Sequence, residues 1–230
     1  MVIINQIRLQ RFFMKKFILN LLTVLLAFSL SGYITSYAQY DIGLESVEVP
    51  KNRKQTFGKQ VIVKSEEKGK TKYTFEDDII KTTWFVTSSN IYFDLKNKTD
   101  HLIKIIWDEA VFVDQNGESH SVMHSGTKYI DRNNPKSPTT IVRNGKISDI
   151  VFPSDYVYYQ SGKYGGWREL DLIKNYYTTN DPEGDTLVQE LAKKEINKTI
   201  QVLLPIKIEN ITNEYIFVFK VKNFKVITRG

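Results

Sequence analysis

The stretch WDEAVFVDQNGESHSVMHSG, residues 107 to 126, decides the fold because it has the pattern of two strands joined by a tight turn. Its centre, Asp114-Gln115-Asn116-Gly117, places Asp first and Gly fourth, as in a type I turn followed by a G1 bulge. A three-residue loop then pairs Asp114 with Glu118, which predicts an antiparallel β-hairpin. Counting outward, the register places three more pairs opposite each other: Phe112 with His120, Ala110 with Val122, and Asp108 with His124.

The register also bears on metal binding by two of the histidines. On a strand, residues four apart lie about 13 Å from each other at roughly 3.3 Å per residue. His120 and His124 therefore cannot both reach one ion held at about 2 Å. We expect no metal site at these histidines and no cofactor. The pairing of His124 with Asp108 is interpreted as a surface ion pair worth under about 1 kcal/mol, with an acid-base dyad or half of a metal site as the alternative.

Alternation of β-branched or aromatic residues with polar residues continues along the chain, broken by turn residues about every ten positions. This pattern predicts an all-β fold, an antiparallel β-sandwich with one short inserted helix. Strands are expected at residues 45–49, 59–64, 71–75, 80–87, 90–95, 102–113, 118–124, 139–142, 146–151, 200–208 and 214–227.

A single domain is expected over residues 39–230, with a loop and helix insertion at about residues 160–198. The GKYGGW run in this insertion is too glycine-rich for a regular strand. Asp181-Pro182 is typical of a helix start. The expected apolar face of that helix consists of Leu187, Val188 and Leu191.

Two of the expected strands contain residues that break a regular ladder. Pro205 has no N–H to donate, so we expect the strand at residues 200–208 to lie at an edge or to carry a bulge. The last strand is long, and Lys222-Asn223 predicts a kink within it.

The N-terminal residues have the order of a secretory signal peptide. Two lysines precede an apolar run from Phe17 to Leu30, and Ser36-Tyr37-Ala38 is a small-x-Ala cleavage pattern. The apolar run is short for a membrane span, which needs about 20 residues. We expect residues 1–38 to be a signal peptide, with Met14 as the true start. The mature chain would then be periplasmic or extracellular, with no membrane span.

Charge and cysteine content exclude several classes of function. Four of the 32 basic residues lie in the leader, which has no acidic residue, so 28 basic and 26 acidic residues remain. A nucleic-acid partner is not expected, because such binding needs clustered basic residues. The chain has no cysteine, which excludes disulfides, thiolate metal ligands, a cysteine nucleophile and the acylated cysteine of a lipoprotein. We therefore expect no lipid anchor.

Two long connections are the expected positions of partner-binding residues, since loops on a sheet scaffold often carry them. Residues 126–138 are polar and turn-rich, and residues 154–169 concentrate aromatic side chains around three glycines. Aromatic rings with polar tips suit sugars, peptides or a protein partner. The candidate ligand-binding residues are Tyr156, Tyr158, Tyr159, Tyr164 and Trp167. The alternative is that Tyr156 and Tyr158 are half-buried strand positions and that Trp167 closes one end of the sandwich.

Three runs, KIIWDEAVFVD, HSGTKYIDRNNPKSPTTI and ISDIVFPSDYVYYQSGKYGGWRE, together carry a resemblance. Over about residues 80–170 the chain resembles small exported or lipid-anchored bacterial envelope proteins. The resemblance implies an immunoglobulin-like sandwich, and it assigns no function and no catalytic residue. Many such proteins carry a lipobox cysteine, which this chain lacks.

These observations predict an exported binding or structural module of the cell envelope, not an enzyme, with a protein or glycan of the envelope as its partner. One alternative is a carbohydrate-binding module, which several loop aromatics in one exposed flat platform would favour. A second alternative is a hydrolase with a carboxylate site in the 126–170 loops. Clustering of Asp131, Asp149 or Asp155 around one cleft would favour the hydrolase.

Overall fold

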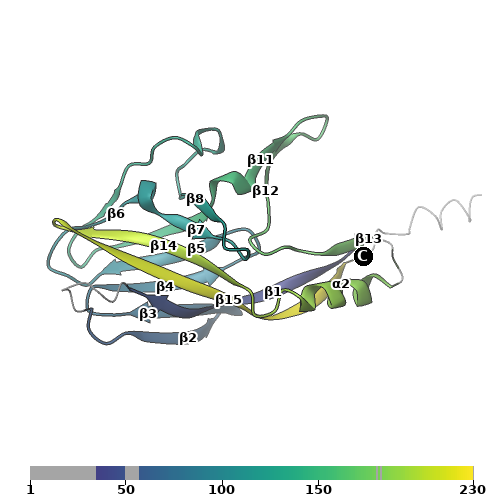
Figure 1. Cartoon of the computed structure of the whole chain (residues 1–230), viewed down its shortest axis with the longest axis horizontal. Coiled ribbons are helices and arrows are strands. Elements are labelled where there is room, and N and C mark those ends of the chain that lie inside the picture. The colour runs from purple at the N-terminus through teal and green to yellow at the C-terminus, as the bar shows by residue number, and fades with distance from the viewer. Residues whose placement is uncertain (1–34, 50–56, 180, 182, 230) are drawn as a thin grey trace, which may run out of the picture.

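The computed structural model describes residues 35–49, 57–179, 181 and 183–229. These residues form a mostly antiparallel β structure with one α-helix, which confirms the all-β prediction at that level. A 13-stranded sheet runs in the order β13-β1-β15-β14-β7-β8-β10-β5-β4-β3-β2, with β6 and β9 paired beside β14 (Figure 1). Its strands are β1 (Thr35–Glu48), β2 (Val61–Glu67), β3 (Lys70–Glu76), β4 (Ile80–Val86), β5 (Ile91–Asn97), β6 (Ile103–Ile105), β7 (Val111–Val113), β8 (Ser119–Met123), β9 (Thr139–Ile141), β10 (Lys146–Pro153), β13 (Tyr177–Thr179), β14 (Thr199–Ile208) and β15 (Ile211–Arg229).

The sheet curls so that its two halves face each other across one aromatic core (Figure 1). Trp84 on β4 lies with its ring centroid 4.5 Å from that of Phe217 on β15. Phe75 on β3 packs edge-on against Phe217 at 5.9 Å. These contacts join strands that are distant along the sheet order, and the rings are fully buried. Burying such large side chains is the main stabilising contribution expected here, at about 1.5–3 kcal/mol each.

The predicted hairpin forms near its turn with the predicted register. Phe112 lies opposite His120, and the Asp114 N–H donates to the Glu118 carbonyl at 2.9 Å. Gly117 has φ of 86° and donates its N–H to the Asp114 carbonyl, as the turn requires.

Farther from the turn the predicted register is wrong, because the expected strand at residues 102–113 is broken. A 3-10 helix, η1 (Trp107–Glu109), separates β6 from β7 and turns Asp108 away from His124. Asp108 instead accepts the Lys136 N–H at 2.7 Å.

The prediction that Pro205 marks an edge strand or a bulge is wrong, since β14 lies inside the sheet in regular register with β15. On its other side, β14 pairs with β7 through residues 201–203 and with β6 through residues 206–208. Pro205 falls in the gap that η1 leaves between β6 and β7. Its carbonyl faces that gap and accepts the Ile106 N–H at 3.0 Å. The missing N–H therefore costs no ladder bond.

The predicted irregularity near Lys222-Asn223 is confirmed as a bulge within β15. Asn223 pairs with Asp41, whereas Val221 pairs with Ile42, so Lys222 has no residue opposite it on β1. An extra residue on one strand of an antiparallel pair bends that strand and increases its twist.

The expected insertion at residues 160–198 contains more regular structure than the sequence suggested. GKYGGW leads into a short strand, β12 (Gly166–Glu169), which Gly166 enters with φ of 149°. Within the described ranges the α-helix is α2 (Gly184–Lys193), and its start is held by Asp181, whose Oδ1 accepts the Glu183 N–H at 3.0 Å.

The buried face of α2 differs from the predicted one. Its buried residues are Gly184, Val188 and Ala192, while Leu187 is exposed. Val188 and Ala192 are spaced by one helical turn, so they face the sheet together, and they pack against Ala38 of β1. In the part of the chain that the structure describes, no helix is long and apolar enough to cross a membrane.

The first described residues bear on the predicted leader. Residues 1–34 of that leader lie outside the described residues, whereas Thr35 to Ala38 begin β1. They pair with the end of β15, and Thr35 to Tyr37 also pair with β13. Ala38 is buried against α2. Cleavage after Ala38 would therefore remove the first four residues of β1 as described here.

Candidate functional site

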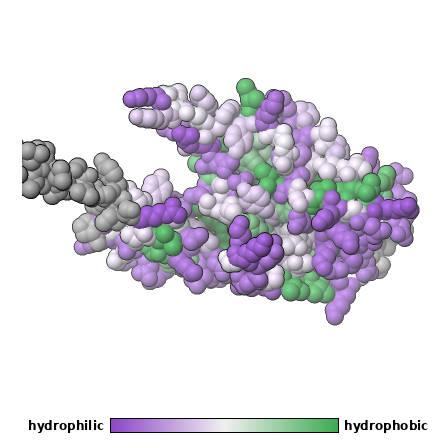
Figure 2. All heavy atoms as spheres, turned by 180° about the vertical axis from the view of Figure 1, so that it is seen from behind, coloured by the Kyte–Doolittle hydropathy of each residue, from purple (hydrophilic) through white to green (hydrophobic). Residues whose placement is uncertain are grey.

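A hairpin separate from the large sheet carries most of the candidate aromatic residues. Strand β11 (Val157–Gln160) pairs with β12 in a two-stranded sheet that, among the described residues, has no further strand. The hairpin stands away from the body of the molecule in Figure 1, and Figure 2 shows it from behind as a projecting arm at the upper left. We call residues 157–169 the aromatic arm.

Exposed tyrosines and basic side chains occupy the outer part of the aromatic arm. Tyr164 at the tip is 79% exposed, and Tyr158 and Tyr159 are also exposed. The Lys163 ammonium lies 5.4 Å from the centre of the Tyr164 ring, and Arg168 Nη2 donates to the Tyr164 carbonyl at 2.9 Å. Lys163 and Arg168 were missed as candidates, although both flank the aromatic residues in the sequence KYGGWRE.

Trp167 lies at the base of the arm and is half-buried. Its ring packs edge-on against Tyr159 at 5.6 Å and 74°, and against Tyr129 at 5.7 Å and 65°. The Arg132 guanidinium lies 5.3 Å from its ring centre. Trp167 also contacts a small buried cluster formed by Met123, Phe152 and Val157. The residue therefore fastens the arm to the body and closes this end of the structure.

A polar contact also fixes the base of the arm. The Tyr129 hydroxyl donates to Glu169, and this hydrogen bond, followed by burial, raises the pKa of Tyr129 to about 12. The other oxygen of Glu169 accepts from the Asn90 side chain at 3.1 Å. Glu169, the only acidic side chain of the arm, is thus hydrogen-bonded at the base of the arm. The other charged side chains of the arm, Lys163 and Arg168, are positive.

Tyr156, the fifth candidate, lies apart from the other four. It belongs to a 3-10 helix, η3 (Ser154–Tyr156), and packs edge-on against His120 at 5.3 Å and Phe112 at 6.0 Å. Burial raises the pKa of Tyr156, and the negative charges of nearby carboxylates raise it further: Asp114, Asp155 and Glu118. Tyr156 therefore marks a second polar cluster near the hairpin turn.

His120 is the centre of this second cluster. Its Nδ1 lies 2.7 Å from Oδ2 of Asp155, and its side chain is 11% exposed. Its Nε2 is buried and has no hydrogen-bond partner among the described residues. One ligand atom each from Asp114, Glu118 and His120 lie within 4.8 Å of one another. The sequence register already placed these three side chains on one face of the hairpin, because Asp114 pairs with Glu118 and His120 follows two residues later.

Asp114 is held rigidly by the hairpin turn. Its Oδ1 accepts the N–H groups of Asn116 and Glu118, each at 2.8 Å, and its Oδ2 accepts from the Asn116 side chain at 3.0 Å. Burial alone would raise the pKa of Asp114, but these hydrogen bonds outweigh it and the pKa is lowered. Asp114 is therefore a fixed negative charge at neutral pH.

His124 lies in a different environment from His120. Its ring stacks on Trp107 with centroids 4.2 Å apart and planes 1° apart, and its Nδ1 lies 3.4 Å from Oδ2 of Asp149. The predicted partner Asp108 is therefore replaced by Asp149 on β10. The interpretation of His124 as a surface ion pair is corrected as well, because the stacked ring is mostly covered.

The three carboxylates named for the hydrolase alternative make separate contacts. Asp131 accepts from the Asn134 side chain at 3.2 Å, and Asp149 accepts the Ser125 N–H at 2.7 Å. Asp155 contacts His120. Each carboxylate thus has its own partner, and the pocket described next contains none of the three.

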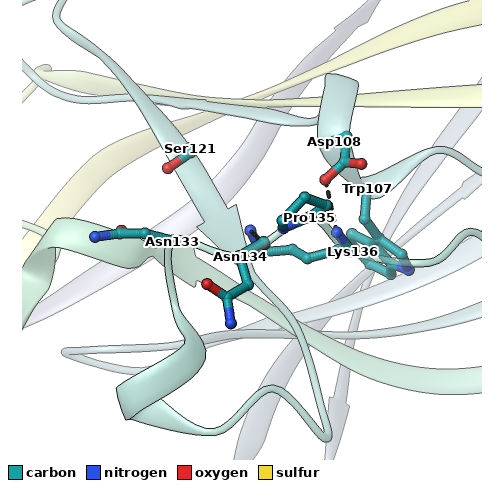
Figure 3. Close-up of a pocket in the computed structure, with 7 residues that line it drawn as sticks. All are labelled: Trp107, Asp108, Ser121, Asn133, Asn134, Pro135 and Lys136. Carbon is teal, nitrogen blue, oxygen red and sulfur yellow. Dashed lines mark hydrogen bonds between the residues drawn. The ribbon is translucent and has the colours of Figure 1, made fainter.

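A pocket of about 280 Å³ lies where the 126–138 loop crosses the end of β8 (Figure 3). Its lining residues are Trp107, Asp108, Ser121, Asn133, Asn134, Pro135 and Lys136. Asp108, its one carboxylate, is bonded to the Lys136 backbone, as the dashed line in Figure 3 shows. This volume lies at the lower end of the roughly 300–1,000 Å³ typical of ligand pockets. Its amides and its single bonded carboxylate offer no acid-base pair for catalysis.

Comparison of the chain with protein-family models, with curated proteins and with solved structures finds no match.

Proposed function

We propose that the protein is an exported, non-enzymatic binding module of the bacterial cell envelope, and that it captures a protein partner with the aromatic arm. The observation that carries the proposal is the exposure of Tyr158, Tyr159 and Tyr164 on a hairpin outside the large sheet. Tyr is enriched in protein interfaces because its ring gives contact area and its hydroxyl gives a hydrogen bond. The leader-like N-terminus and the resemblance to envelope proteins support the location.

The shape of the arm favours a protein surface over a sugar. Flat sugar rings are bound by a flat aromatic platform, whereas Trp167 meets Tyr159 at 74° and Tyr129 at 65°. The basic groups of Lys163 and Arg168 lie beside the exposed Tyr164. A partner surface with acidic side chains would complement this combination of rings and positive charge.

The finer fold description is part of the same proposal. We propose that the two halves of the curled sheet correspond to the two layers of an immunoglobulin-like sandwich, with β7, β8 and β10 connecting them. The contact of Trp84 with Phe217 across the core supports this description. In such sandwiches the binding residues lie on loops and hairpins at the ends of the layers. The aromatic arm would be a hairpin of this kind.

Crosslinking pull-downs from intact envelope test the proposal. Wild-type protein should capture a defined partner, and Tyr164→Ala and Tyr159→Ala should each reduce that capture at least fivefold. The matched control is Tyr177→Ala, because Tyr177 on β13 is 72% exposed and outside the arm. Equal capture by all four proteins would contradict the proposed role of the arm. Binding of envelope polysaccharide that depends on Tyr164 would replace the protein partner with a glycan.

A further inference from the structure

We infer that Asp114, Glu118 and His120 bind a divalent transition metal ion of the zinc class at the hairpin turn. One ligand atom from each residue lies within 4.8 Å of the other two. Two carboxylate oxygens and one imidazole nitrogen make a mixed donor set that suits zinc and its neighbours better than calcium, which prefers oxygen alone. The site is independent of the aromatic arm and of the function proposed for it.

The orientation of His120 is the strongest observation for this site. Its Nδ1 is engaged by the Asp155 carboxylate at 2.7 Å, which leaves Nε2 as the nitrogen available to an ion. Nε2 is buried, and within the described part of the chain it has no hydrogen-bond partner. A buried polar atom without a partner costs free energy, and a bound ion would remove that cost. A carboxylate bonded to the opposite nitrogen is the usual way in which a metal-binding imidazole is oriented.

The charge around His120 also suits a cation. The Asp155 carboxylate lies 2.7 Å from His120 Nδ1, and one ligand atom each from Asp114 and Glu118 lies within 4.8 Å of a His120 ring nitrogen. Among the described ion pairs, these carboxylates pair with His120 alone, and no lysine or arginine pairs with them. Three negative charges around one imidazole leave a net negative site, which a divalent ion would neutralise.

Only a small movement of the side chains would bring the three ligand atoms close enough to hold one ion. Zinc binds nitrogen and oxygen at about 2.0–2.2 Å, so two of its ligand atoms lie at most about 4.4 Å apart. Asp114 is fixed by the turn, whereas Glu118 is exposed and its side chain is free to rotate toward the ion. Three protein ligands would leave a fourth position to water or to a partner's side chain.

This inference revises the expectation that the histidines bind no metal. The spacing argument excluded one ion shared by His120 and His124, and the structure does place these residues against different carboxylates, Asp155 and Asp149. A site with one histidine is compatible with the same spacing. Such a site uses the predicted hairpin register, which brings Asp114, Glu118 and His120 to one face.

Isothermal titration of the purified protein with zinc chloride tests the site. We expect one-to-one binding with a Kd of about 1 μM or tighter, at least tenfold weaker binding for Glu118→Gln, and loss of binding for His120→Ala. Because His120 packs against Phe112 and Tyr156, its variant is paired with Glu118→Gln, which changes an exposed side chain. The control is His101→Ala, since the His101 side chain is 59% exposed and lies elsewhere.

Two results would overturn the inference. The first is the absence of stoichiometric zinc binding, or binding that Glu118→Gln and His120→Ala leave unchanged. The second is calcium binding of equal affinity that His120→Ala does not weaken, which would show a site made of oxygen ligands alone. Nitrogen NMR of the histidines gives a further test, because zinc should shift the His120 Nε2 resonance and leave His101 in place.

Discussion

The Tyr215 hydroxyl donates a hydrogen bond to Oδ2 of Asp77 across 2.8 Å, which joins the first part of β15 to the turn between β3 and β4 inside the core. Asp77 is 1% exposed. Its Oδ1 accepts the N–H groups of Ile79 and Ile80, each at 2.8 Å. One buried carboxylate thus satisfies three donors and connects the two halves of the curled sheet.

We expect Asp77→Ala to destabilise the protein by more than about 3 kcal/mol, because each buried donor left without an acceptor costs about 1–3 kcal/mol. Tyr215→Phe should cost about 1–2 kcal/mol, since it removes one donor and keeps the ring packing. Urea unfolding followed by tryptophan fluorescence measures both values. A free energy of unfolding for Asp77→Ala within 0.5 kcal/mol of wild type, roughly the size of an ordinary surface substitution, would contradict this role.

The pH dependence of stability provides a separate test at Asp77. Burial raises the pKa of Asp77 above its ordinary value of 3.8, and the hydrogen bonds from Ile80, Tyr215 and Ile79 oppose this shift without cancelling it. The folded protein therefore holds this proton more tightly than the unfolded chain. The stabilisation from protonated Asp77 is fully present below pH 3.8 and is lost as the pH rises through the raised, folded-state pKa.

Asp77→Asn should remove this dependence, because an amide does not ionise in this range. As the pH rises from about 4 to 7, we expect wild type to lose unfolding free energy relative to Asp77→Asn. The loss should be about 1.4 kcal/mol for each unit by which folding raises the pKa of Asp77. Urea unfolding at a series of pH values measures it. Parallel stability curves for the two proteins would show that the pKa of Asp77 is not raised.

Local patterns in the sequence predicted most strands of the large sheet and the hairpin turn, because alternation and turn residues are properties of neighbouring residues. They predicted no strand at β11, β12 or β13, and β1 begins ten residues before the strand expected at residues 45–49. They did not predict η1, which interrupts the expected strand at residues 102–113. The break lies opposite Pro205, which is almost 100 residues away and whose carbonyl accepts the Ile106 N–H in the gap between β6 and β7. Contacts of this kind join distant segments and leave no periodic signal in either one.

The candidate sites were also only partly predictable from local sequence patterns. The exposure of Tyr164 fits a glycine-rich loop sequence, whereas no local pattern predicted that Trp167 packs against Tyr129. The acidic and histidine cluster was within reach of the predicted register. The approach of Asp155 to His120 was not predictable in this way, because it is a contact between distant segments.

Trp167 and Tyr164, both predicted from the sequence to bind a ligand, should differ in how much stability is lost when each side chain is truncated to alanine. Trp167→Ala removes a half-buried ring from its packing, so we expect a cost of about 2 kcal/mol, below the 3–5 kcal/mol of a fully buried ring. Tyr164→Ala should cost less than about 0.5 kcal/mol. Thermal unfolding should show a drop in Tm of about 4–8 °C for Trp167→Ala and under about 2 °C for Tyr164→Ala. Equal drops would mean that the tip of the arm is packed as tightly as its base.

The last prediction concerns the start of the mature chain. The charged, apolar and small-residue order of the leader predicts cleavage near Ala38, so mass spectrometry of protein from the native host should find a start at Gln39 or Tyr40. A start at or before Thr35 would contradict this cleavage site, and an intact leader in the membrane fraction would contradict export as a soluble protein.

Cleavage at Ala38 also has a structural consequence that can be measured. It would remove the buried contact of Ala38 with Val188 and Ala192 and the pairing of β1 with β13. We therefore expect hydrogen exchange in α2 to be faster in a chain that begins at Gln39 than in one that begins at Thr35, because local opening follows the loss of buried contacts. Exchange in β14 should be the same in both chains, since β14 pairs with β15, β6 and β7 and not with β1. Equal exchange in α2 would show that the first four residues of β1 do not hold the helix in place.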